Sequence, residues 1–167
     1  MATAGINETT QFLTFRLDEE IFALDITKVR EVLDYTIVTK VPRTPDFMRG
    51  VINLRGSVVP VVDLRLKFGM SATESGVNTC IIITEVQVDN ETIVLGALAD
   101  AVQEVLDLDA GSIAAPPRIG TKLRTEFIKG MGKQNDRFII ILDIDKVFST
   151  DELTSVRQDE TAAGPAS

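Results

Sequence analysis

Arg49-Gly-Val-Ile-Asn-Leu-Arg-Gly-Ser-Val-Val-Pro-Val-Val-Asp-Leu-Arg65 is the segment of this chain that decides its fold. It contains two apolar runs rich in β-branched residues, which predict strands over Arg49–Leu54 and Val58–Leu64. Gly56-Ser57 separates the runs and predicts a tight turn, so the segment is expected to form a β-hairpin. Pro60 has no backbone N–H to donate, and its strand is therefore expected at a sheet edge or beside a bulge.

The rest of the chain is also patterned mainly as strands, because its apolar residues alternate or form short runs. Short helices are expected only over Asp63–Phe68 and over Asp145–Val156, and Thr27–Leu33 is left without an assignment. The further strands that we expect are Gln11–Leu17, Glu20–Ile26, Asn78–Val88, Glu91–Ala99 and Arg137–Leu142.

The sequence contains an internal repeat. Val29-Arg-Glu-Val-Leu-Asp34 and Val102-Gln-Glu-Val-Leu-Asp107 differ only at their second position, and Val61–Phe68 aligns with Ile141–Phe148 later in the same order. A repeat of this length is too long for a solenoid. It favours a tandem duplication of a small barrel of about five strands, since barrel closure removes exposed strand edges.

The expected organisation is one domain over residues 10–153, made of two lobes. The first lobe covers about 10–70 and the second about 78–150, with a polar linker at 69–77 and chain ends that can cross between the lobes. Residues 1–9 and 155–167 are polar and weakly patterned, and they are expected to be disordered tails.

The composition argues against most catalytic and metal-binding sites. The chain of 167 residues has no histidine, which removes the commonest general base and the commonest metal ligand. Its single cysteine, Cys80, lies in an apolar run and is expected to pack as a small hydrophobe. The net charge of −8 argues against nucleic-acid binding, which depends on neutralising phosphates. We therefore expect no cofactor, no metal site and no membrane insertion.

Several charged residues lie at turns or at matching positions of the repeat, where they could have a structural or a binding role. Asp63 and Asp143 occupy matching positions of the repeat, so we interpret them as turn residues that accept backbone N–H groups rather than as a catalytic pair. Arg55, at the hairpin end, is interpreted as a structural clamp on a carboxylate such as Asp63. Glu31 recurs as Glu104 in the second copy and is expected at the rim of a groove or simply in solvent.

These segments together resemble the CheW family of chemotaxis coupling proteins over about residues 11–153. The motifs that carry the resemblance are Phe22-Ala-Leu-Asp-Ile-Thr-Lys-Val-Arg-Glu-Val-Leu33, Val41-Pro-Arg-Thr-Pro-Asp-Phe47, Gly50-Val-Ile-Asn-Leu-Arg-Gly56, Val59-Pro-Val-Val-Asp-Leu-Arg65 and Ile128-Lys-Gly-Met-Gly132.

The resemblance implies a mainly β fold, in which two SH3-like five-stranded barrels pack around a shared hydrophobic core, with short helices and a C-terminal helix. It also implies a cytoplasmic, non-catalytic adaptor between methyl-accepting chemoreceptors and the histidine kinase CheA, located at the inner face of the membrane in receptor arrays. Val29 and Glu31 match the family's receptor-contact motif. Arg55, with Gly56 and Asp63, matches its structural turn, and the kinase contacts cannot be assigned.

Two alternatives stay open from the sequence. One is a coupling module of another chemosensory pathway, such as one that controls surface motility. The other is a small enzyme that uses paired carboxylates, which would require a deep cleft holding Asp63 and Asp143 together.

Overall fold

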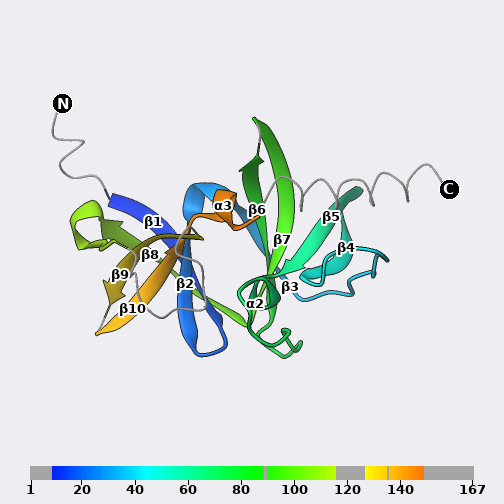
Figure 1. Cartoon of the computed structure of the whole chain (residues 1–167), viewed down its shortest axis with the longest axis horizontal. Coiled ribbons are helices and arrows are strands. Elements are labelled where there is room, and N and C mark those ends of the chain that lie inside the picture. Colours follow the sequence, from blue (N-terminus) through cyan, green and yellow to red (C-terminus); the bar gives the residue numbers. More distant parts are fainter. Residues whose placement is uncertain (1–8, 89, 116–126, 135, 149–167) are drawn as a thin grey trace.

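The computed structural model describes residues 9–88, 90–115, 127–134 and 136–148, which form two curled five-stranded sheets lying side by side (Figure 1). Sheet A has the order β8 (Ala101–Asp109), β1 (Thr9–Leu17), β2 (Glu20–Asp25), β10 (Arg137–Leu142) and β9 (Ile128–Gln134). Sheet B has the order β3 (Val29–Asp34), β6 (Cys80–Val88), β7 (Glu91–Ala99), β5 (Ser57–Asp63) and β4 (Met48–Leu54). The short helices are η1 (Ile26–Lys28), α2 (Leu64–Lys67), η2 (Ala110–Ser112) and α3 (Ile144–Val147).

This architecture confirms the expected mainly β fold with two five-stranded units. The hairpin expected from Arg49–Leu54 and Val58–Leu64 forms as β4 and β5, with the pair Leu54↔Ser57 next to the turn. Pro60 of β5 pairs with Val51 of β4 on one side. On the other side, the pairing of β5 with β7 begins only at Val61, so β5 has a single neighbouring strand at the position of the proline. Strands β3, β8 and β9 were not assigned from the sequence, and they pair with β6, β1 and β10 respectively.

The expected boundary at residues 69–77 does not separate the two sheets. Sheet B is continuous from β3 to β7, but sheet A combines β1 and β2 from the start of the chain with β8, β9 and β10 from its end. Each sheet is completed by a parallel contact, β2 with β10 and β5 with β7, between strands far apart in sequence. The chain therefore crosses between the sheets twice, through η1 and again at Asp100, between β7 and β8.

The predicted duplication is visible in the topology. The orders β8-β1-β2-β10-β9 and β3-β6-β7-β5-β4 place repeat-related strands at the same positions, and β5 and β10 are each followed by a helix of one turn, α2 and α3. The amide of Asp63 donates to the carbonyl of Phe47 at 2.6 Å, and the matching amide of Asp143 donates to that of Phe127 at 2.8 Å.

A shared apolar core joins the two sheets. Phe15 and Phe22 of sheet A are fully buried, and the Phe22 ring stacks on Phe68, which follows α2, with 5.8 Å between ring centroids. The phenyl ring of Phe47 is also buried and packs on Phe148, 5.5 Å away between centroids.

Two terminal predictions fall partly outside the described residues. Of the expected C-terminal helix over Asp145–Val156, the described part contains α3, which ends at Val147, and residues 149–156 lie outside the described residues. Residue 9, expected in the N-terminal tail, begins β1, and the other residues of both expected tails are not described. Among the described residues, no helix is long and apolar enough to cross a membrane.

Candidate functional site

A side-chain ion pair joins the two edge strands of sheet B. Glu31 lies on β3, at one edge of the sheet, and Arg55 lies in the turn that ends β4, at the other edge. Arg55 Nη1 donates to Glu31 Oε1 at 3.3 Å, and Arg55 Nη2 donates to Glu31 Oε2. Since no ladder connects β3 to β4, this bidentate pair closes the sheet where the backbone does not.

The local sequence places Arg55 at this point. Arg55 and Gly56 both have positive φ, 50° and 88°, which fits a tight primed-type hairpin turn. Asn53 Oδ1 accepts the amide of Gly56 at 2.8 Å and stabilises the turn. The Arg55 side chain then extends over the sheet end, where 70% of it remains exposed.

The pair also fixes the charge state of Glu31. Its hydrogen bonds with Arg55 lower the pKa of Glu31 below the ordinary value of 4.5, despite a smaller opposing effect of desolvation, and the nearby charges of Arg55 and Arg30 lower it further. The same hydrogen bonds raise the pKa of Arg55. A lowered carboxyl pKa means that the pair is present at neutral pH and is lost only as the pH falls through that lowered value.

Beside the pair lies a groove of about 760 Å³. Its apolar lining comes from sheet B and includes Leu54, Val59, Ile83, Val94 and Leu95, and its rim carries Arg30, Glu31, Arg55, Glu91 and Thr92. Val58 also lines the groove, and 51% of its surface is exposed, which is high for a large apolar residue. An open groove that combines apolar side chains with charged and polar ones is suited to a protein segment, whose apolar and polar side chains can both be accommodated there. We call these residues the Glu31 groove.

The structure places only part of the sequence-predicted site in this groove. Glu31, an expected receptor contact, and Arg55, expected as a structural turn residue, lie together at its rim. Val29, the other expected contact residue, is half-buried at the start of β3 and packs against the shared core instead of lining the groove.

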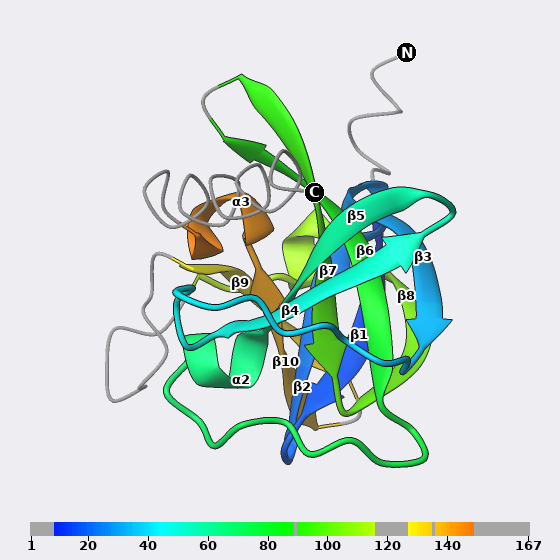
Figure 2. The ribbon, with the colours of Figure 1, turned by 90° about the vertical axis from the view of Figure 1, so that its right-hand side faces the viewer.

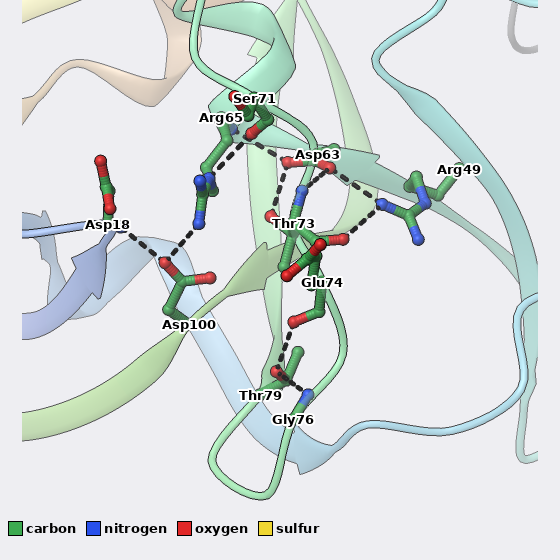
Figure 3. A network of polar contacts seen from close by, with 10 residues as sticks. All are labelled: Asp18, Arg49, Asp63, Arg65, Ser71, Thr73, Glu74, Gly76, Thr79 and Asp100. Carbon is green, nitrogen blue, oxygen red and sulfur yellow. Dashed lines mark hydrogen bonds and ion pairs between the residues drawn. The ribbon is translucent and has the colours of Figure 1, made fainter.

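The clamp expected of Arg55 forms on the carboxylate of Glu31, and its expected partner Asp63 was wrong. Asp63 is fully buried, and its carboxylate accepts the amide and the hydroxyl of Thr73, both at 2.8 Å, the amide of Arg65 at 3.0 Å and Arg49 Nη1 at 3.0 Å (Figure 3). Sequence reasoning missed Arg49. In the hairpin, Met48 pairs with Val62 and a bulge leaves Arg49 unpaired, which allows its side chain to reach Asp63, whereas Arg55 lies at the far end of the hairpin.

The Asp63 contacts also explain the segment expected to be a linker. Residues 70–77 form no regular element, yet Thr73 is buried and held by Asp63, and Arg49 Nη1 donates to the Thr73 carbonyl at 3.0 Å. Asp63 is therefore a structural anchor, as predicted from its turn position. The matching Asp143 occupies the N-cap position of α3, but its side chain makes no capping hydrogen bond.

The geometry gives little support to the paired-carboxylate enzyme. Neither Asp63 nor Asp143 lines the Glu31 groove, and the four donors around Asp63 occupy its carboxylate. Within the described ranges, no three acidic or cysteine side chains gather closely enough to hold a metal ion.

Comparison with known proteins identifies relatives along nearly the whole chain. The family model described as "CheW-like domain" matches residues 11–152. The chemotaxis protein CheW of Klebsiella aerogenes is 38% identical over 92% of this chain and 90% of its own length. Protein FrzA of Myxococcus xanthus is 28% identical, with 84% of this chain and 86% of FrzA covered. The crystal structure of the scaffolding protein TtCheW from Thermoanaerobacter tengcongensis superposes with a TM-score of 0.76 and 36% identity, over 87% of this chain and 91% of that one.

Proposed function

Because this chain belongs to the family of CheW-like domains, we propose that it is a non-catalytic adaptor that couples methyl-accepting chemoreceptors to the histidine kinase CheA in bacterial chemotaxis. The Glu31 groove is the observation that carries the proposal, since it offers a preformed surface for a protein segment and no catalytic group. The protein acts in the cytoplasm, at the inner face of the membrane when receptors assemble into arrays.

The receptor contact is the helical tip of a chemoreceptor bundle against the rim that carries Glu31. The bidentate Arg55 pair holds the Glu31 carboxylate in one place, so that less side-chain freedom is lost when a partner binds. Val29 supports the receptor contact indirectly, because it packs against the shared core at the start of β3, the strand that carries Glu31.

No reaction is needed for such an adaptor to control a kinase. By holding receptor and kinase in one geometry, it lets a receptor movement bias the kinase between two states. Each contact can be weak, because a complex with several linked contacts raises the effective concentration at every site.

The substitution Glu31→Lys tests the receptor contact. We expect it to weaken receptor binding about 10- to 100-fold, because it places a like charge against the partner's basic site and against Arg55. Thermal unfolding should be nearly unchanged, since exposed ion pairs contribute little to stability. Binding is measured with receptor-containing membranes, and unfolding by circular dichroism.

The matched control is Glu104→Lys, which makes the same charge change at the repeat-related position of β8, in sheet A and outside the groove. It should bind receptors like the parent protein. Equal losses of binding in both variants, or a fall in melting temperature that accounts for the loss in Glu31→Lys, would argue that Glu31 is not a receptor contact.

Arg55→Ala is expected to weaken receptor binding less than Glu31→Lys, because it frees the Glu31 carboxylate without adding repulsion. The melting temperature should change little, since the Arg55 side chain is mostly exposed and does not contact Asp63. Arg55→Lys should restore binding only in part, because an ammonium group cannot form the bidentate pair. An early loss of stability in Arg55→Ala, with binding intact in the folded protein, would assign Arg55 a structural role instead.

A further inference from the structure

The two chain crossings between the sheets are each accompanied by an ion pair. At the second crossing, Asp100 Oδ2 accepts Arg65 Nη1 of α2 at 2.9 Å (Figure 3). At the first crossing, Lys28 of η1 donates through Nζ to Asp145 Oδ2 of α3 at 2.7 Å. All four side chains are at most 29% exposed, so solvent and salt screen these pairs less than they screen surface pairs.

Each of the two carboxylates also accepts a backbone amide from the other side of the boundary between the sheets. Asp100 Oδ2 accepts the amide of Asp18 at 2.5 Å, in the β1–β2 turn of sheet A, while Arg65 belongs to α2, which follows β5 of sheet B. Asp145 Oδ1 accepts the amide of Gln87 at 2.8 Å, in β6 of sheet B, while α3 follows sheet A. Each carboxylate thus joins the two sheets.

The repeat relates the two arrangements. Arg65 and Asp145 occupy the same position of the repeat, because Val61–Phe68 aligns with Ile141–Phe148, and each lies in the helical turn that follows a repeat-related strand, β5 or β10. The charges are reversed between the copies: the helix supplies the cation in one and the anion in the other. In both copies, nevertheless, the residue in the helix and the residue at the chain crossing carry opposite charges. Figures 1 and 2 show α3 above and α2 below, at opposite ends of the boundary between the sheets.

We infer that the Lys28–Asp145 and Arg65–Asp100 pairs act together as a two-point brace that sets the angle between sheets A and B. Apolar burial holds the sheets together, but it is not directional, and packed faces can slide over one another by small shear motions. Two partly buried ion pairs at opposite ends of the boundary select one arrangement, because sliding separates opposite charges at one end or the other. The brace is a property of the fold and does not depend on the proposed adaptor role.

The test measures the distance between spin labels on the two sheets in the full chain. Labels are attached to Val58→Cys in β5 and Lys133→Cys in β9, both exposed, with Cys80→Ser removing the native thiol. In this background, Lys28→Gln with Arg65→Gln removes both cations and leaves both carboxylates on their backbone donors. The matched control is Arg30→Gln, which breaks an ion pair with Glu85 between two strands of sheet B alone.

The brace predicts one narrow distance in the parent and in Arg30→Gln, and loss of that narrow distance in the double variant. Lys28→Gln alone and Arg65→Gln alone each keep one ion pair and should broaden the distribution of label-to-label distances only slightly. The broadening in the double variant should therefore exceed the sum of the broadenings in the two single variants. Independent, distant sites would instead add. Lys28→Arg retains the cation and should keep the narrow distance. The amides of Asp18 and Gln87 should exchange about tenfold faster in the double variant.

A double variant with parent-like width and exchange would overturn the brace, since the apolar core alone would then set the angle. Additive single effects, or equal broadening in Arg30→Gln, would overturn it as well. Circular dichroism shows whether the double variant is folded. If it is not, the comparison rests on Lys28→Gln, which must broaden the distance relative to Lys28→Arg.

Discussion

Asp63→Ala should lower the free energy of unfolding by about 3–5 kcal/mol, because it removes the single carboxylate on which four donors converge. The buried amide and hydroxyl of Thr73 would lose their acceptor, and Arg49, whose side chain is 30% exposed, would be left as a partly buried cation without this partner. The loss should be measurable by urea unfolding monitored with circular dichroism.

The repeat supplies the control for this prediction. Asp143→Ala changes the same residue type at the matching position, but the Asp143 side chain caps no helix amide, and its closest ion pair is Lys146 at 3.9 Å. It should cost about 1 kcal/mol or less. Equal effects of the two substitutions would show that the repeat position, and not the hydrogen-bond network around Asp63, accounts for stability.

Phe22→Ala is the second substitution expected to have a large effect, with a loss of about 3–5 kcal/mol in the free energy of unfolding. The Phe22 side chain is fully buried at the centre of the shared core, where its ring packs between Phe15 and Phe68, 6.0 Å and 5.8 Å away between centroids. The cavity would open between the sheets, so both should lose protection from amide hydrogen exchange together. Denaturant unfolding and mass-spectrometric exchange measure the two effects.

Phe138→Ala removes the same ring from the surface of sheet A, where the side chain is 61% exposed. We expect a change within about 0.5 kcal/mol. A core role for Phe22 would be contradicted if the two variants were equally stable, or if Phe22→Ala loosened sheet A alone.

Strand identity could be predicted from this sequence because apolar alternation and turn residues are local signals. The β4–β5 hairpin and the α2 turn both follow from residues that are neighbours in the chain. Strand β8 escaped because three consecutive residues, Gln103, Glu104 and Val105, are exposed, which hides the alternation at this sheet edge. Crossing of the chain ends between the two lobes was expected, but the pairing of the strands could not be predicted, because the parallel contacts of β2 with β10 and of β5 with β7 depend on side chains distant in sequence.

The site shows the same division between local and distant information. The repeat pointed to Glu31, and the turn pointed to Arg55, but the sequence did not show that these two side chains pair with each other. Their contact depends on the curl of sheet B, which brings its two edge strands together. The Asp63 clamp was assigned to the wrong arginine for a related reason, since the register of the hairpin, and not proximity to the turn, decides which side chain reaches the carboxylate.

Coupling of chemoreceptors to CheA can be measured as CheA autophosphorylation in a reconstituted mixture. Purified CheA and receptor-containing membranes are assayed with and without this protein, and with Glu31→Lys and Glu104→Lys in its place. The account predicts a large increase in autophosphorylation that needs all three components and is suppressed by receptor ligand. Glu104→Lys should reproduce this increase and Glu31→Lys should not. No increase with the parent protein, together with no binding to CheA or to receptors in a pull-down, would contradict the adaptor function.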